Sequence, residues 1–197
     1  MRKGGRQVLW VMLIMGLIAA IGLTVAVAKP KMFDKSEDAG KVDEPTKWLP
    51  DYDKLAAGHD ADWVYFPAGS LKSYKSVTVK AFTTNAVEDH ADEAETAAKN
   101  GKKYFDQWLK KAGFNVIDEG TADLTFEGNI FDAWEPSGAG RFWGGWMANP
   151  GAGIEVMAKD SSGKVVAEIR HKSRGSTVKD AVENGLENIV KDIGKVK

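Results

Sequence analysis

The sequence contains no cysteine and only three histidines among its 197 residues. Without cysteine no disulfide can support the fold, so an apolar core must stabilise it. The same absence excludes a lipid anchor carried on a processed cysteine. It also removes the thiolate ligands that many metal sites use, and the histidines lack the short spacings typical of such sites. We therefore predict neither a metal site nor a cofactor.

Long hydrophobic runs are confined to the N-terminus. Arg2, Lys3 and Arg6 precede an apolar run over residues 8–28, which ends in the small-x-small pattern Ala26-Val27-Ala28. This arrangement is typical of a signal peptide. The run is 21 residues long, enough to cross a bilayer as a helix, so an uncleaved membrane anchor remains the alternative. We expect the protein in the periplasm, or tethered to the inner membrane and facing the periplasm.

The remaining chain has little excess charge of either sign. Residues 29–47 are charged and contain Gly and Pro, which predicts a flexible tether. Residues 48–197 form the length of a single domain. Removal of the three N-terminal basic residues leaves 24 Lys and Arg against 28 Asp and Glu. Nucleic-acid-binding domains usually carry a basic face, so we predict no nucleic-acid partner.

Hydrophobic periodicity predicts five strands and two helices after the signal or anchor helix. The helices are expected over residues 91–112 and from Ser176 or Thr177 to the C-terminus, because apolar residues recur there at helical spacing. The strand over 122–131 alternates apolar and polar residues and should be half-exposed. Residues 63–66 form either an edge strand or a segment packed across the core. The expected fold is α/β (α+β), a single mixed sheet of about five strands with two packing helices. The strands are expected over residues 77–82, 114–118, 122–131, 154–159 and 164–172.

Catalytic motifs are missing from the sequence. It has no Gly-x-Ser-x-Gly elbow, and neither of its Gly-Ala-Gly segments continues as a phosphate-binding loop. His59 with Asp60 and Asp62 suits a solvated loop better than a weak cation site. We therefore predict no catalytic residue. The alternative is an enzyme, such as a hydrolase, in which Glu127 and Asp132 meet only in the fold and act as acid and base.

One connection is unusually apolar. Residues 134–153 hold six glycines and two prolines together with several large aromatic residues. Connections normally run through water, and Trp and Arg are enriched at binding hot spots. The segment therefore predicts either an exposed site for a protein, glycan or membrane surface, or a lid packed over one end of the core. The candidate binding residues are Trp134, Arg141, Phe142, Trp143, Trp146 and Met147.

Several motifs in the second half of the chain occur in a familiar order. They are Ala122-Asp123-Leu124 with Gly128, the stretch over residues 141–145, Gly151-Ala152-Gly153, and the hairpin over residues 160–164. In this order they resemble the bacterial envelope proteins grouped as domain of unknown function 4410, and residues 48–83 resemble a related exported group. The resemblance implies an envelope location and an α/β domain, without an established activity. This chain departs from the pattern by lacking the lipid-bearing cysteine.

Together these features predict an exported cell-envelope protein that acts as a non-enzymatic binding or adaptor domain. Its expected partner is an envelope protein or a membrane surface. The alternative is a small-molecule, lipid or glycan binder that uses Trp143, Trp146 and Arg141 to line a cleft.

Overall fold

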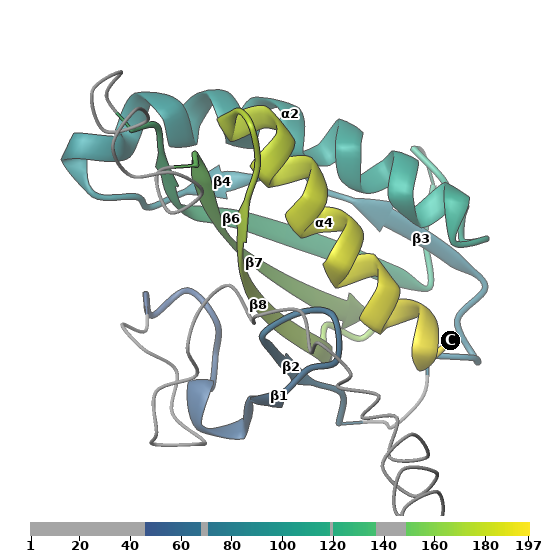
Figure 1. The fold of residues 1–197 in the computed structure, drawn as a ribbon. Helices are drawn as coiled ribbons and strands as arrows, with labels where there is room; N and C mark the ends of the chain where they lie inside the picture. Colours follow the sequence, from purple (N-terminus) through teal and green to yellow (C-terminus); the bar gives the residue numbers. More distant parts are fainter. Residues whose placement is uncertain (1–45, 68–70, 119, 137–148) are drawn as a thin grey trace, which may run out of the picture. The chain divides into compact units, whose positions relative to one another are not determined.

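The computed structural model describes residues 46–67, 71–118, 120–136 and 149–197. Within them the chain forms one mixed sheet of eight strands and two long helices. Both helices lie on the same face of the sheet (Figure 1). The predicted mixed α+β class with two helices is confirmed, but the predicted number of five strands is too low.

The sheet combines an antiparallel half and a parallel half. Its order is β1-β2-β8-β7-β6-β3-β5, and β4 also pairs with β6. Neighbouring strands along β1-β2-β8-β7-β6 are antiparallel to each other. In contrast, β3 runs parallel to both of its neighbours, β6 and β5. The strands are β1 (Ala56–Ala57), β2 (Trp63–Tyr65), β3 (Ser76–Val79), β4 (Thr83–Thr84), β5 (Asn115–Val116), β6 (Leu124–Trp134), β7 (Gly151–Asp160) and β8 (Val165–Arg174).

Three short strands were not defined by the sequence, although the equally short β5 lies within the predicted range 114–118. β1, β2 and β4 contain two or three residues each, too few to show a period of two. β2 pairs with both β1 and β8, so it is not the outermost strand. The three long strands were predicted correctly in position, but β6 and β7 extend three residues further into the connection between them.

A β-bulge explains why the sequence pattern did not show that β6 continues to Trp134. The register between β6 and β7 shifts between Ile130 and Asp132. Ile130 packs in the core on the helix-covered face, and after the bulge Ala133 does so. A bulge adds one residue to a strand and therefore changes which positions face each side. Strict alternation ends at this point, and with it the sequence signal for the strand.

The helices match their predicted ranges. α2 (Ala91–Lys111) ends shortly before Gly113, which has φ of +79°. α4 (Val178–Lys195) begins after Thr177, whose side chain accepts the backbone N–H of Asp180 at 3.1 Å. This contact is the predicted N-terminal cap. No helix in the described parts of the chain is both long and apolar enough to cross a membrane.

Apolar side chains fill the space between the helices and the sheet. Phe105 of α2 makes an edge-to-face contact with Phe126 of β6, with ring centroids 5.4 Å apart. Leu186 and Ile189 of α4 are fully buried in the same cluster as Ile154 of β7. Burial of such side chains contributes about 1.5–3 kcal/mol each. This core holds β6, β7 and β8 in place for the surface on their other side.

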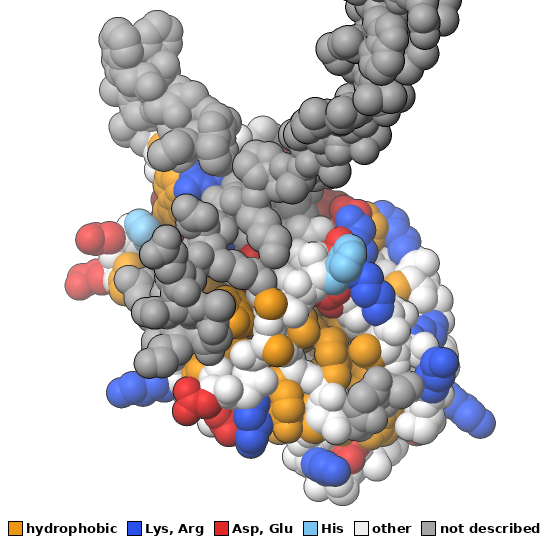
Figure 2. Space-filling view, turned by 60° about the horizontal axis from the view of Figure 1, so that its bottom comes forward, with side chains coloured by type: hydrophobic (Ala, Val, Ile, Leu, Met, Phe, Trp, Pro, Cys, Tyr) orange, Lys and Arg blue, Asp and Glu red, His pale blue; other side chains and the backbone are white. Residues whose placement is uncertain are grey.

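The opposite face of the sheet is covered in part by the segment that precedes β1. Leu49 and Leu55 form a second, smaller cluster with Met157 of β7. Tyr52 belongs to a short 3₁₀ helix, η1 (Tyr52–Lys54), in the same segment. In a view from this side of the domain, hydrophobic side chains gather near the middle and many Lys and Arg side chains lie toward the edge (Figure 2).

Candidate functional site

Two aromatic rings lie against glycines where β6 and β7 pair at the end of the hairpin. Gly151 pairs with Trp134, and Gly153 pairs with Asp132, the residue after Phe131. A Cβ atom on Gly151 would lie 2.4 Å from the Trp134 Nε1 atom, and one on Gly153 would lie 2.4 Å from the Phe131 ring. Only glycine allows the rings to approach the backbone so closely. Both glycines therefore serve to position the rings.

Basic residues of β8 lie over these rings. The Arg170 guanidinium carbon is 3.8 Å from the centroid of the Phe131 ring, and the Lys172 Nζ atom is 5.9 Å from it. Arg174 lies 4.9 Å from the centroid of the Trp134 ring. Such cation–π contacts orient the ring and the cation relative to each other. Burial lowers the pKa of the Arg174 side chain. We call this set the aromatic–cation surface; it consists of Phe131, Trp134, Arg170, Lys172 and Arg174.

A buried polar network holds Arg170 in position. Its guanidinium donates to Glu155 of β7, and the two side chains are 3% and 0% exposed. Glu155 also accepts hydrogen bonds from the Tyr52 hydroxyl and the Thr46 hydroxyl, both at 2.7 Å, and from the Asn129 amide at 3.3 Å. Burial raises the pKa of Tyr52, so its hydroxyl remains a proton donor. The network therefore holds the guanidinium group beside the Phe131 ring.

A pocket of about 400 Å³ adjoins the aromatic–cation surface. The His90 Nδ1 atom lies 2.6 Å from the Asp132 Oδ1 atom at its edge. Val87 is 65% exposed and is the one exposed large hydrophobic residue in the described ranges. Polar, basic and aromatic groups thus converge on one opening. Its lining residues are Thr46, Asn85, Val87, His90, Phe131, Asp132, Arg170 and Lys172.

Of the predicted binding residues, the structure places Trp134. It is the last residue of β6 and is half-buried between Gly151 and Arg174. Arg141, Phe142, Trp143, Trp146 and Met147 lie outside the described residues, so their role stays a prediction. Sequence analysis missed the contribution of β8. The available signal was the alternation of Arg170, Lys172 and Arg174, which places them on one face of a strand.

Glu127 and Asp132 are not brought together by the fold. Both belong to β6, where Glu127 pairs with Met157 and Asp132 pairs with Gly153, about 13 Å apart along β7. Glu127 binds Lys80 at 2.7 Å and Lys159 at 2.9 Å. Burial raises the pKa of Glu127, but the two lysines outweigh it and hold the pKa below its usual range. The two carboxylates therefore lack the geometry of a general acid and base, and Glu127 lacks the raised pKa of a general acid.

The predicted loop acids near His59 have structural roles. His59, Asp60 and Asp192 lie close enough to form a candidate cation site. The Lys195 ammonium, however, binds both Asp60 and Asp192. The Asp192 Oδ2 atom also accepts the backbone N–H groups of His59, Asp60 and Ala61 at 2.9–3.0 Å. The lysine supplies the positive charge of the cluster, which attaches the loop to α4.

Asp62 contacts a different histidine from the one expected. Its Oδ2 atom lies 3.0 Å from the Nδ1 atom of His171 and accepts the backbone N–H of Lys172 at 2.8 Å. The other ring nitrogen of His171 lies 3.2 Å from the Asn188 amide of α4. His171 is 6% exposed. The ring therefore connects β8, α4 and the loop before β2, and this arrangement is structural.

Two of the motif residues that carry the family resemblance, Asp123 and Asp160, have local structural roles, whereas residues 141–145 lie outside the described residues. Asp123 accepts the backbone N–H groups of Lys75 and Ser76 at 2.7 and 2.9 Å, which joins the starts of β3 and β6. These bonds hold the pKa of Asp123 below its usual range. Asp160 accepts the backbone N–H groups of Ser162 and Lys164 within the β7–β8 turn. The motifs therefore specify the hairpin and strand junctions.

No protein-family model matches the sequence, and no curated protein matches it. Among solved structures, the fold is similar to the PelC dodecamer from Paraburkholderia phytofirmans, with 15% identity, coverage of 64% of this chain and 96% of that chain, and a TM-score of 0.44. It is also similar to a candidate lipoprotein from Caulobacter crescentus CB15, with 11% identity, coverage of 58% and 88%, and a TM-score of 0.38. These values do not assign a family, so membership of domain of unknown function 4410 stays a prediction.

Proposed function

We propose that this chain is an exported envelope protein whose domain binds a partner protein through the aromatic–cation surface and has no catalytic activity. The location rests on the N-terminal export pattern over residues 1–28. The binding role rests on the surface described above, which includes Trp134, the last residue of β6. The expected partner is another envelope protein.

The observation that carries the proposal is the prearranged geometry of the rings and cations. Gly151 and Gly153 admit the rings, and Arg174 and Arg170 lie over them. Rings and guanidinium groups that are already ordered lose little conformational entropy on binding, which favours affinity. Aromatic and Arg side chains are also those that dominate binding energies at interfaces. Phe131 and Arg170 are 8% and 3% exposed, so the partner would contact half-buried Trp134, Lys172 and Arg174, which Phe131 and Arg170 support from beneath.

The neighbouring pocket supports a second candidate, binding of a small molecule or glycan. Its volume of about 400 Å³ is within the range typical of small-molecule sites. Its lining combines the exposed side chain of Val87 with the polar side chains of Asn85 and His90. Tryptophan fluorescence titrated with envelope glycans separates the candidates. A saturable shift supports the glycan candidate, whereas a flat response supports recognition of a protein alone.

The partner proposal is tested by crosslinking intact cells, followed by pulldown and mass spectrometry. We compare the wild type with Trp134→Ala and with Trp108→Ala, which removes a half-buried tryptophan of α2 that stacks with Lys111. We expect one envelope protein to be captured by the wild type and the Trp108 variant but lost in the Trp134 variant. Equal capture by all three, or capture of nothing specific, would contradict the proposed surface.

N-terminal sequencing of the same exported material tests the location and the processing. A mature protein that begins at Lys29 indicates a cleaved signal peptide, because the small-x-small pattern ends at Ala28. An intact N-terminus in the membrane fraction indicates an anchor. Recovery from the cytoplasm contradicts export.

A further inference from the structure

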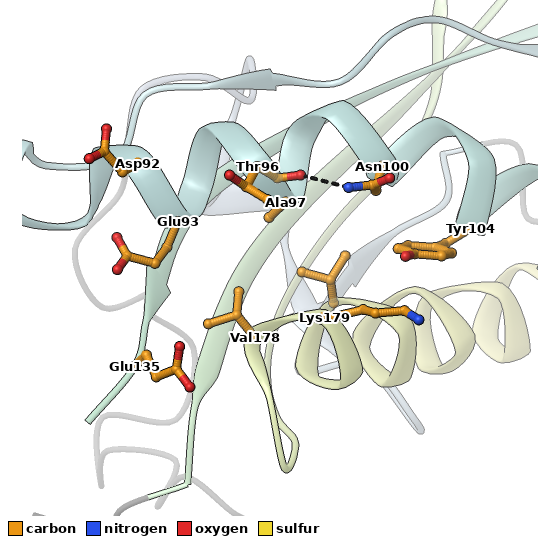
Figure 3. A pocket seen from close by; sticks show the side chains of 10 residues that line it. Asp92, Glu93, Thr96, Ala97, Asn100, Tyr104, Glu135, Val178 and Lys179 are labelled. Atoms are coloured by element: carbon orange, nitrogen blue, oxygen red, sulfur yellow. Dashed lines mark hydrogen bonds between the residues drawn. The ribbon is translucent and has the colours of Figure 1, made fainter. Parts of the chain in front are cut away.

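A second pocket lies on the helix-covered side of the domain. It has a volume of about 410 Å³ and opens between α2 and α4 (Figure 3). Its walls come from residues 92–104 of α2, from residues 178–182 of α4, and from Glu135, which follows β6. The lining residues are Asp92, Glu93, Thr96, Ala97, Asn100, Tyr104, Glu135, Val178, Lys179 and Val182.

The centre of this pocket is apolar. Ala97 of α2 and Val182 of α4 are 7% and 0% exposed, and half-buried Val178 continues the apolar surface toward the start of α4. The ring of Tyr104, with its hydroxyl group, lies at the end of the pocket opposite Glu93 (Figure 3). Pockets of this size with an apolar lining and a few polar groups are the usual form of small-molecule sites. The shape and lining therefore suit an apolar body of modest size.

Negative charge gathers at one end of the pocket. Asp92, Glu93 and Glu135 contribute their carboxylates to the lining. The positive N-terminus of α2 accounts for acidic residues in its own first turn. It does not account for Glu135, which follows the last residue of β6 and lies at the same end of the pocket as Glu93 (Figure 3). Two structural elements thus place carboxylates beside one apolar floor.

We propose that this pocket binds a small organic cation, a protonated amine carried on an apolar body. The body would lie on Val178 and the accessible part of Ala97, and the ammonium would lie between Glu93 and Glu135. An anion of the same shape would meet these carboxylates in a partly enclosed space, where like charges repel strongly. The site is on the face opposite the aromatic–cation surface and does not depend on it.

The absence of cysteine makes a direct test simple. In the full-length chain, Thr96→Cys introduces a unique thiol at an exposed position on the pocket wall. Its rate of modification by N-ethylmaleimide, a neutral reagent, is measured with 4-phenylbutylamine, 4-phenylbutanol or 4-phenylbutyrate present. These probes share an apolar body and differ in charge. Ser162→Cys in the exposed β7–β8 turn gives a reference thiol far from the pocket.

We expect the amine to protect the thiol at position 96 at concentrations about fivefold lower than the alcohol, and the carboxylate to protect least. The double change Glu93→Gln and Glu135→Gln should remove the advantage of the amine, because it removes the two carboxylates that face the ammonium. Glu95→Gln is the matched control on α2, since Glu95 pairs with Lys99 and does not line the pocket. It should leave the advantage intact.

A steric variant separates pocket binding from general surface attraction. Asn100→Trp places a ring in the opening from an exposed position of α2, so the core should be undisturbed. It should abolish protection by all three probes. Equal protection by the three probes, protection of the Ser162→Cys reference, or protection that survives Asn100→Trp would overturn the proposal, as would no protection at all.

Discussion

The two faces of the sheet are formed by the same long strands, yet different forces stabilise them. Ile154 and Val156 of β7 are fully buried against the helices as part of the apolar core. Glu155, between them in sequence, is equally buried on the other face, where it binds Arg170 and three further donors. The helix-covered face therefore depends mainly on apolar packing, and the other face depends in addition on a buried hydrogen-bond network.

This difference determines what each face can do. An apolar core tolerates substitution by other apolar residues of similar volume. A buried ion pair, in contrast, is strongly destabilised when one of its two members is removed. The network holds Arg170 over Phe131, so the order of the aromatic–cation surface depends on residues beneath it. The helix-covered face instead leaves a pocket where α2 and α4 diverge.

The largest effect is expected from Glu155→Ala. This change leaves the Arg170 guanidinium buried without its carboxylate, and breaking a buried pair in this way costs about 3–5 kcal/mol. The free energy of unfolding is measured by urea titration followed by tryptophan fluorescence. Glu95→Ala removes a carboxylate from an exposed pair with Lys99 and should cost less than about 0.5 kcal/mol. A similar small loss for both variants would show that the network contributes little.

A smaller effect is expected from Gly153→Ala. The added methyl group would lie 2.4 Å from the Phe131 ring, so the ring or the strand must shift. Such overpacking typically costs about 1–3 kcal/mol, and displacement of the ring should weaken partner capture as well. Gly194→Ala is the matched control in α4, because nothing lies within 4 Å of its added atom. It should raise stability by about 0.5–1 kcal/mol, and unchanged stability in Gly153→Ala would refute the close packing.

The smallest effect is expected in the pH dependence contributed by Glu168, a 3% exposed residue of β8. Burial raises the pKa of Glu168 in the folded state. The folded state then binds more protons than the unfolded state between the ordinary and the raised pKa, so this group lowers stability as pH rises through that window. Glu168→Gln should abolish this loss and be more stable than the wild type at neutral pH. Parallel stability curves for both proteins from pH 4 to 8 would contradict the assignment.

The carboxylates of the turns behave in the opposite sense. Hydrogen bonds hold the pKa values of Asp123 and Asp160 below their usual range, so their contributions are lost as pH falls. As the pH changes, Glu168 and these two aspartates therefore shift the free energy of unfolding in opposite directions. One titration of stability against pH reports on both.

The helices show how much of the fold was accessible from sequence. Apolar residues at helical spacing and the cap at Thr177 predicted α4 to within one or two residues, because both signals are local. The half-exposed strand predicted over residues 122–131 was only partly correct. Thr125 and Glu127 are partly exposed, but Asn129 is fully buried, since it binds Asn85 and Glu155.

The residues of the candidate site were likewise predicted only in part from the sequence. The sequence identified Trp134 through the unusual composition of the connection that follows it. It did not identify Arg170 or Lys172, because a polar residue on an alternating strand normally faces water. Their role depends on Phe131, which is brought beneath them by pairing of β6, β7 and β8.

By itself the sequence determined the two helices, the three long strands and the β7–β8 turn, since each is specified by the period or capping of neighbouring residues. Only the tertiary structure decided that Glu155 is buried, that glycines of β7 support two rings, and that α2, α4 and the end of β6 enclose a pocket. These features join residues as much as 109 positions apart. No local pattern records such contacts, because they form only when the strands and helices pack together.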